Sequence, residues 1–140
     1  MIAYLEPFTG IGEFKFGKKI DDFLHLGHFD VNPPEKYSSK SYTMQNPEIT
    51  IWVNEANLIE TIGCYEECLY KGRNMIEMKI DEFIAWSDTN YYGKPDILDF
   101  EENSDIPQKV YEFEDIGLQI WTKLNVIITV IASEYESYGE

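Results

Sequence analysis

Two histidines and two cysteines are the side chains of this sequence best suited to metal or nucleophilic chemistry. His25 and His28 are three residues apart, a spacing at which two ligands on a helix can share a metal ion. A zinc site needs three or four ligands, and the sequence holds no other histidine. Cys64 and Cys68 have three residues between them, not the two of thiol redox motifs and zinc knuckles. We therefore expect no metal site and two reduced thiols, although adjoining strand ends at these positions would bring the thiols close enough to pair.

Residues 87–107 concentrate carboxylates and aromatic rings in a segment that we expect to be a long loop. Loops of about twenty residues are uncommon in a compact domain and are usually functional or disordered. The carboxylates lack the spacing and internal glycine of a calcium loop, and such a run is often simply solvated. Aromatic rings among carboxylates nevertheless suit a protein interface, because the rings supply buried area and the charges steer association. The residues that we expect to contact a partner are Tyr91, Tyr92, Asp96, Asp99, Phe100, Glu101, Glu102 and Asp105.

Motifs for catalysis or cofactor binding are missing from the sequence. Gly10-Ile11-Gly12 lacks the third glycine and the strand–helix setting of a dinucleotide fingerprint. There is no glycine-rich phosphate loop, and no serine or cysteine sits in a nucleophile-elbow sequence. Arg73 is the single arginine, so bidentate binding of phosphate or carboxylate substrates would be poorly supported. We expect a binding protein without a cofactor, not an enzyme.

The charge of the chain indicates what kind of partner it attracts. The net charge is −15, from 26 acidic and 11 basic side chains, and residues 96–140 alone hold 11 acids and 2 bases. A nucleic-acid binder needs the opposite sign, and an anionic membrane would repel this chain. The partner favoured by this field is a basic protein or a cation.

Length and apolar content indicate one domain, 1–140. A chain of 140 residues with 44% hydrophobic side chains can bury a core without disulfides or metals. No apolar run approaches the ~20 residues of a membrane helix. The first residues lack the basic and long apolar regions of a secretory signal, and two cysteines are too few for a disulfide scaffold. We expect a cytoplasmic protein.

Helical and strand periodicities alternate along the chain. Apolar residues at helical spacing predict two short helices, on Ile20, Phe23 and Leu24 and on Ile80, Phe83 and Ile84. Alternating patterns predict strands at residues 13–16, 41–44, 48–54, 58–65, 68–71, 109–113, 118–122 and 126–133. Tight turns between these strands imply antiparallel pairing.

Three pairs of similar segments occur in the same order along the chain. Residues 18–25 match 78–85, residues 51–52 match 120–121, and residues 58–63 match 126–131, with offsets of 60, 69 and 68. This order predicts an internal duplication, with repeat one at about 10–66 and repeat two at about 67–135. The predicted fold is α+β: an antiparallel sheet of about six to eight strands with two short helices packed on one face, in a tandem helix–strand-meander repeat. At least one of Trp52 and Trp121, which fall on equivalent strands, is expected beneath its helix.

A small acidic domain of this layout resembles the bacterial immunity proteins that protect a cell from its own contact-dependent or polymorphic toxins. Residues 10–17, leading into a helix, also resemble the opening of small bacterial domains found beside such toxins. The tandem helix-plus-strands repeat is similar in outline to the β-lactamase-inhibitor-like fold. The resemblance implies a cognate toxin as partner, and many such toxins are nucleases with a basic cleft that an acidic inhibitor can occupy. It assigns a role to no individual residue.

Two other functions stay open on the sequence alone. The chain could be a small enzyme whose site combines scattered carboxylates with His25 or His28, and a pocket holding a histidine and two carboxylates would favour that hypothesis. It could also be a homo-oligomeric structural module in which an edge strand at residues 118–122 pairs with a second copy. For the inhibitor we expect a monomer or weak dimer that docks through residues 88–105 and an exposed face of the sheet.

Overall fold

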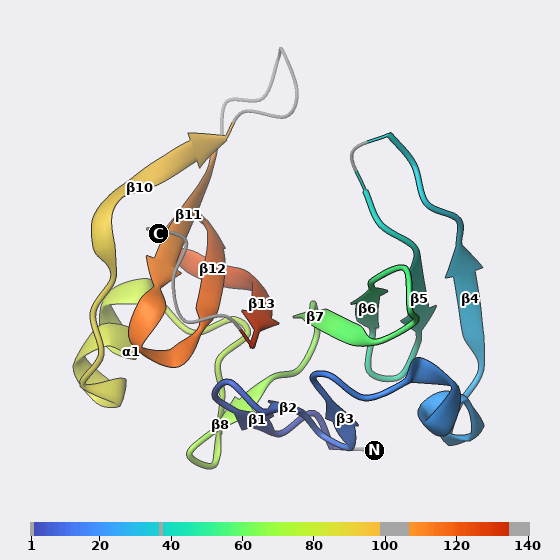
Figure 1. The fold of residues 1–140 in the computed structure, drawn as a ribbon. Helices are drawn as coiled ribbons and strands as arrows, with labels where there is room; N and C mark the ends of the chain where they lie inside the picture. The colour runs from blue at the N-terminus through green and yellow to red at the C-terminus, as the bar shows by residue number, and fades with distance from the viewer. Residues whose placement is uncertain (1, 37, 99–106, 135–140) are drawn as a thin grey trace.

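Eight strands form one antiparallel sheet in the computed structural model, which describes residues 2–36, 38–98 and 107–134. The strand order is β10-β11-β12-β13-β7-β6-β5-β4, so the sheet consists of two four-strand meanders joined side by side (Figure 1). The first meander comprises β4 (Phe29–Asn32), β5 (Ser41–Met44), β6 (Ile49–Val53) and β7 (Ile59–Cys64). The second comprises β10 (Tyr92–Leu98), β11 (Gln108–Phe113), β12 (Leu118–Lys123) and β13 (Val126–Ser133). The predicted α+β class and mainly antiparallel sheet are confirmed.

The last strands of the two meanders, β7 and β13, pair with each other in antiparallel register. This β7–β13 seam joins residues that are far apart in sequence, and no other strand pair links the two meanders within the eight-stranded sheet that the structure describes. The paired residues are Cys64 with Val130, Gly63 with Ile131, Ile62 with Ala132, and Thr61 with Ser133.

Alternation along the strands divides the sheet into a core face and an opposite face. On β6, Ile49, Ile51 and Val53 have no exposed surface and belong to the hydrophobic core. Thr50 and Trp52 alternate with them and therefore point to the other side. We call this other side the open face, because none of its larger side chains from β6 and β12 belongs to the core cluster.

Two short helices contribute buried apolar residues to the same core. Ile20–Leu26 forms the 3-10 helix η1, and Ile80–Ser87 forms the α-helix α1. A third element, η2 (Glu114–Ile116), is a single turn. Ile80 and Phe83 of α1 are buried, and the Phe83 ring meets Phe113 of β11 edge-on at a centroid distance of 5.3 Å. Both helices start where the apolar spacing predicts them, but the first is of the tighter 3-10 type.

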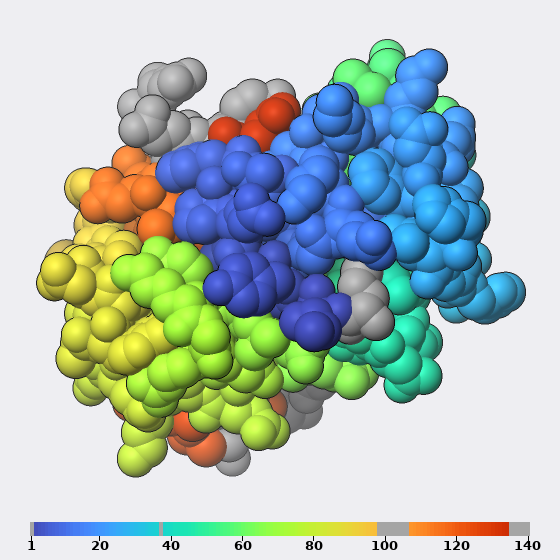
Figure 2. Space-filling view, turned by 90° about the horizontal axis from the view of Figure 1, so that it is seen from below, coloured from blue at the N-terminus to red at the C-terminus, as the bar shows by residue number. Residues whose placement is uncertain are grey.

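Two small sheets lie beneath the core. One consists of β1 (Leu5–Glu6), β2 (Gly10–Ile11) and β3 (Phe14–Lys15), and the other of β8 (Leu69–Tyr70) and β9 (Arg73–Asn74). Seen from below, the N-terminal segment and the segment around β8 lie next to each other (Figure 2). A backbone hydrogen bond of 2.8 Å from Leu69 N to Ala3 O joins them. Gly10 permits the tight β2–β3 hairpin, because a Cβ there would lie 2.0 Å from the carbonyl oxygen of Phe14.

Three sequence-based expectations differ from the structure. Residues 92–98, expected within a long loop, form strand β10, because they pair with β11. Residues 29–32, where alternation predicted no strand, form the edge strand β4, because they pair with β5. Residues 118–122 are not at an edge, because β12 is paired on both sides, with β11 and β13.

None of the helices among the described residues has the length and apolar character needed to span a bilayer.

The burial of two matched phenylalanines gives a prediction about stability. Phe83 has no exposed surface, whereas Phe23, at the corresponding position of η1, is only half-buried. Phe83→Ala should lower the free energy of unfolding by about 3–5 kcal/mol, because it leaves a cavity against Phe113. Phe23→Ala should cost clearly less. Urea denaturation of both variants measures the difference, and equal losses would contradict this account of the core.

Candidate functional site

The expected partner-binding residues divide into three groups. Tyr91 is half-buried, and its ring packs against Tyr111 at 4.8 Å and Phe113 at 6.0 Å between centroids, so it supports the core. Tyr92 is 51% exposed and donates a 2.9 Å hydrogen bond to Asp115 Oδ1. Asp96 is exposed on edge strand β10. The remaining expected contacts lie outside the described residues: Asp99, Phe100, Glu101, Glu102 and Asp105.

The histidines and cysteines form no metal site among the described residues. No group of three or more histidine, cysteine or carboxylate side chains there could hold a metal ion. His28 lines a hollow of about 210 Å³ whose other residues include no carboxylate: Leu24, Gly27, Phe29, Val31 and Tyr42. Cys64 and Cys68 are free and buried. A hydrogen bond with Cys64 and burial both raise the pKa of the Cys68 thiol well above its usual value, which disfavours the reactive thiolate.

The open face runs across all eight strands and carries mostly polar side chains, with Val110, Ile131 and two tryptophans among them. Successive Cα pairs across the sheet define a central row on this face, because directly opposed residues point to the same side. The central row contains Tyr92, Glu112, Gln119, Ile131, Gly63, Thr50, Thr43 and Asp30. A second row contains Asp96, Val110, Trp121 and Thr129, and a third contains Ser133, Thr61, Trp52, Ser41 and Asn32.

Trp52 and Trp121 occupy corresponding places on either side of the central row. Both are half-buried, and neither belongs to the core cluster. The expectation that one of them packs beneath a helix is therefore wrong, because strand alternation directs both to the open face. Gly63 makes room for Trp52, since a Cβ at Gly63 would lie 3.0 Å from Cζ3 of the Trp52 ring.

The first meander presents hydroxyl and amide groups on the open face. The Oγ1 atoms of Thr43 and Thr50 are 3.2 Å apart. Asn32 Nδ2 donates to Ser41 Oγ at 3.1 Å and to Thr43 Oγ1 at 3.2 Å. Burial raises the pKa of Tyr65 above its usual value, although a hydrogen bond with Thr50 acts against that change. This network is neutral at physiological pH.

The second meander presents a partly buried carboxyl group instead. Gln119 Nε2 donates a 2.8 Å hydrogen bond to Glu112 Oε1, while Glu112 Oε2 is buried and has no hydrogen-bond partner in the described part of the chain. Burial raises the pKa of Glu112 above its usual value, and the negative charges of Asp96 and Glu114 act in the same direction. The Gln119 hydrogen bond opposes the change. The surroundings of Glu112 therefore destabilise its charged form, and a nearby cation would stabilise that form.

Sequence reasoning named contact residues only in one acidic segment, and it expected an exposed sheet face without identifying the residues that form it. Trp52, Glu112 and Gln119 were each readable from the sequence as the outward residues of alternating strands. The strand order that brings them onto one surface depends on the β7–β13 seam, and local alternation carries no signal for it.

Comparison with family models, with curated proteins and with solved structures found no match.

The raised pKa of Glu112 gives a prediction about pH dependence. Because its folded-state pKa is raised, protonation favours the folded state, and stability falls as pH rises from the usual value of 4.5 through the folded value. Glu112→Gln keeps an acceptor for Gln119 and removes the charge, so its melting temperature should exceed that of the unaltered protein at neutral pH. The difference should vanish below about pH 4, where Glu112 is protonated in both states.

Removal of any negative charge from an acidic chain relieves some repulsion, so this experiment needs a matched control. Glu55→Gln makes the same charge change at an exposed turn residue. If both variants raise the melting temperature equally at neutral pH, the local environment of Glu112 is not the cause.

Proposed function

We propose that this chain is an immunity or inhibitor protein that binds and neutralises a cognate toxin domain, and that the toxin is a basic nuclease. The observation that carries the proposal is the open face. Its three rows contain the carboxylates Asp30, Asp96 and Glu112 but no lysine or arginine. A negative surface of this kind complements the basic cleft by which a nuclease holds nucleic acid.

The balance of side chains on the open face supports recognition of a protein. Trp52 and Trp121 offer aromatic area, and the threonines and glutamine around them offer hydrogen bonds. Interfaces concentrate binding energy in aromatic residues that a polar rim surrounds. The net charge of −15 adds long-range steering, which raises association rates by ~10–10³. Fast capture suits an inhibitor that must intercept a toxin before it acts.

We propose that the protein is cytoplasmic, because free thiols persist in that compartment. Cys64 and Cys68 are both free in the structure. Reducing conditions keep such thiols unpaired, and the nucleic-acid targets of a nuclease lie in the same compartment.

We also propose that the fold is a tandem repeat of one helix-plus-meander unit, with both helices on the core face of the sheet. Backbone hydrogen bonds at the start of each helix support this. Ile20 N donates to Asn57 O at 2.9 Å. Ile80 N donates to Asn125 O, also at 2.9 Å. The donors are 60 residues apart and the acceptors 68, which are the offsets of the matching sequence segments.

Turn geometry and sheet irregularities support the same duplication. Asn57 and Asn125 have left-handed backbone conformations, with φ of 62° and 64°, at the turns before β7 and β13. The pairing of β6 with β7 shifts register just after Trp52, and that of β12 with β13 shifts just after Trp121. In this arrangement the β7–β13 seam lies on an approximate twofold axis.

Co-expression with a candidate toxin tests the proposed function. The candidate is the C-terminal domain encoded by the gene immediately upstream, if that gene encodes a large secreted protein. The chain should restore growth and bind the isolated domain, and affinity should fall at least ~10-fold between about 0.1 M and about 1 M salt, where the screening length shrinks from ~10 to ~3 Å. Affinity that is flat with salt would contradict electrostatic docking.

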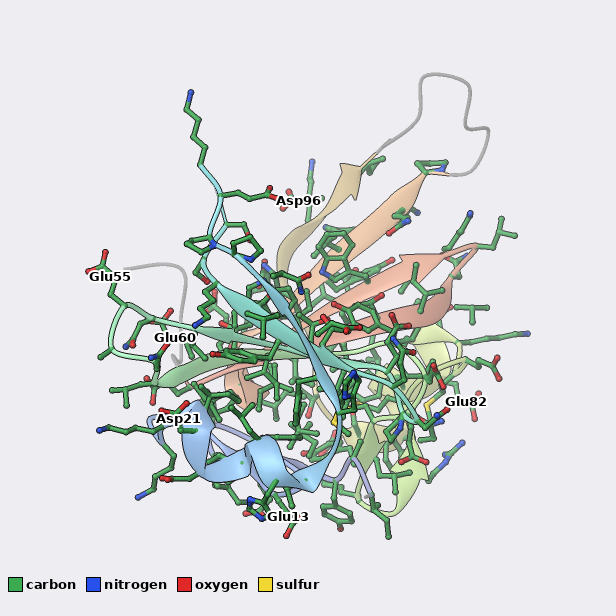
Figure 3. The ribbon with its side chains drawn as sticks, turned by 90° about the vertical axis from the view of Figure 1, so that its right-hand side faces the viewer. Glu13, Asp21, Glu55, Glu60, Glu82 and Asp96 are labelled. Atoms are coloured by element: carbon green, nitrogen blue, oxygen red, sulfur yellow. The ribbon has the colours of Figure 1, made fainter. Side chains whose placement is uncertain are left out.

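Charge reversal on opposite sides of the sheet tests where the toxin docks. Asp96 lies on the side of the open face, and Glu13 lies on the side of η1 (Figure 3). Asp96→Lys should weaken toxin binding ~10-fold or more, whereas Glu13→Lys, which changes net charge equally, should have an effect of about 3-fold or less. Equal effects of the two variants would show that net charge, not the open face, controls binding.

A further inference from the structure

A hollow of about 300 Å³ lies on the open face beside the β7–β13 seam. Its lining comes from the segment before β5, from β6 and β7, and from β13 across the seam. The lining residues are Ser38, Ser39, Trp52, Glu60, Thr61 and Ile131. This volume is at the lower end of the range for small-molecule sites, so it suits one side chain better than a large ligand.

Trp52 and Glu60 are the two residues of this hollow able to recognise charge. The Trp52 ring is held over Gly63, where the missing Cβ leaves space for it. Glu60 lies at the register shift between β6 and β7: Val53 pairs with Ile59 and Trp52 pairs with Thr61, so Glu60 has no partner on β6. An extra residue in a bulge often redirects a side chain toward a functional site.

The carboxylate of Glu60 is available to a ligand. Among the described residues, no hydrogen bond or ion pair involves this carboxylate, and the side chain is only half-buried. The corresponding residue 68 positions later, at the register shift of the second meander, is Ile128. The aromatic–carboxylate pair at the bulge is thus specific to the first half of the chain.

Elsewhere on its surface, the chain has an arginine that contacts both a tryptophan ring and a carboxylate. The Arg73 guanidinium carbon lies 4.9 Å from the centroid of the Trp86 ring, and Arg73 Nη2 is 2.7 Å from Glu82 Oε2. One guanidinium there stacks on an indole and pairs with a carboxylate at once. The hollow at Trp52 has the indole and the carboxylate but no arginine from this chain, since Arg73 is the only one.

We infer that the hollow beside Trp52 and Glu60 receives an arginine side chain of the partner protein, an inference that rests on the proposed function and names its anchoring contact. The guanidinium stacks on Trp52 and pairs with Glu60, and its aliphatic stem packs against Ile131. Arginine fits better than lysine, because its planar group can stack on an aromatic face while it donates to a carboxylate. The net charge of −15 favours a cationic occupant over a neutral one such as a sugar ring.

Indole resonances of the isotope-labelled full chain test this inference without knowledge of the partner. The probe is a short arginine peptide, and the matched control peptide carries citrulline, which has nearly the same shape but no charge. The arginine peptide should shift the Trp52 indole signal, assigned with Trp52→Phe, in a saturable way. The Trp86 signal should move little, because Arg73 already covers that ring. The citrulline peptide should produce a much smaller shift.

Two charge-matched variants show whether Glu60 is responsible. Glu60→Gln should raise the apparent Kd of the arginine peptide at Trp52 by at least ~5-fold, whereas Glu13→Gln, on the side of η1, should change it by less than about 2-fold (Figure 3). Equal effects of the two variants would overturn the inference, and so would a Trp52 signal that a neutral oligosaccharide shifts and the arginine peptide does not.

The inference and the proposed function can fail separately. If the arginine peptide does not bind beside Trp52 while a basic toxin still binds the chain, only the arginine site is refuted. If the hollow binds arginine but no toxin binds, the proposed function fails instead.

Discussion

The antiparallel pairing of β7 with β13 is the constraint on which the rest of the structure depends. Four residue pairs connect two meanders that are otherwise separate within the described sheet. The isoleucines of β6 and Phe113 of β11 lie in different meanders but belong to the same hydrophobic core. One large core buries a greater fraction of the chain than two small ones. Because strand pairing fixes which side chains share a face, the same four pairs place the outward side chains of both meanders on one open face.

The open face shows how one backbone arrangement can carry two kinds of chemistry. The tryptophans and the residues around them occupy corresponding places, but the first meander has a neutral hydroxyl network where the second has Glu112. The bulge of the first meander carries Glu60, and that of the second carries Ile128. The binding surface that we propose therefore differs in charge between its two halves, and it suits a partner that presents different groups to them. This asymmetry distinguishes the arginine site proposed beside Trp52 from the acidic half around Glu112.

Local sequence patterns predicted much of the fold and little of the site. The apolar spacing at Ile20 and Ile80 located both helices, and alternation located most strands of the two meanders, because these signals depend on neighbours in sequence. Strand β10 escaped prediction because Gly93 and Pro95 are typical of loops, and only pairing with β11 makes it a strand. The hollow beside Trp52 requires a residue from β13 next to residues of β6 and β7, a contact that exists only across the seam.

Nuclear Overhauser contacts across the seam, read together with amide hydrogen exchange, test the central claim most directly. The account predicts contacts between the backbones of Gly63 and Ile131, and slow exchange with a common rate for the hydrogen-bonded amides of residues 62–64 and 130–132. Contacts within each meander but none between Gly63 and Ile131, with seam amides exchanging as fast as those of edge strands β4 and β10, would contradict it.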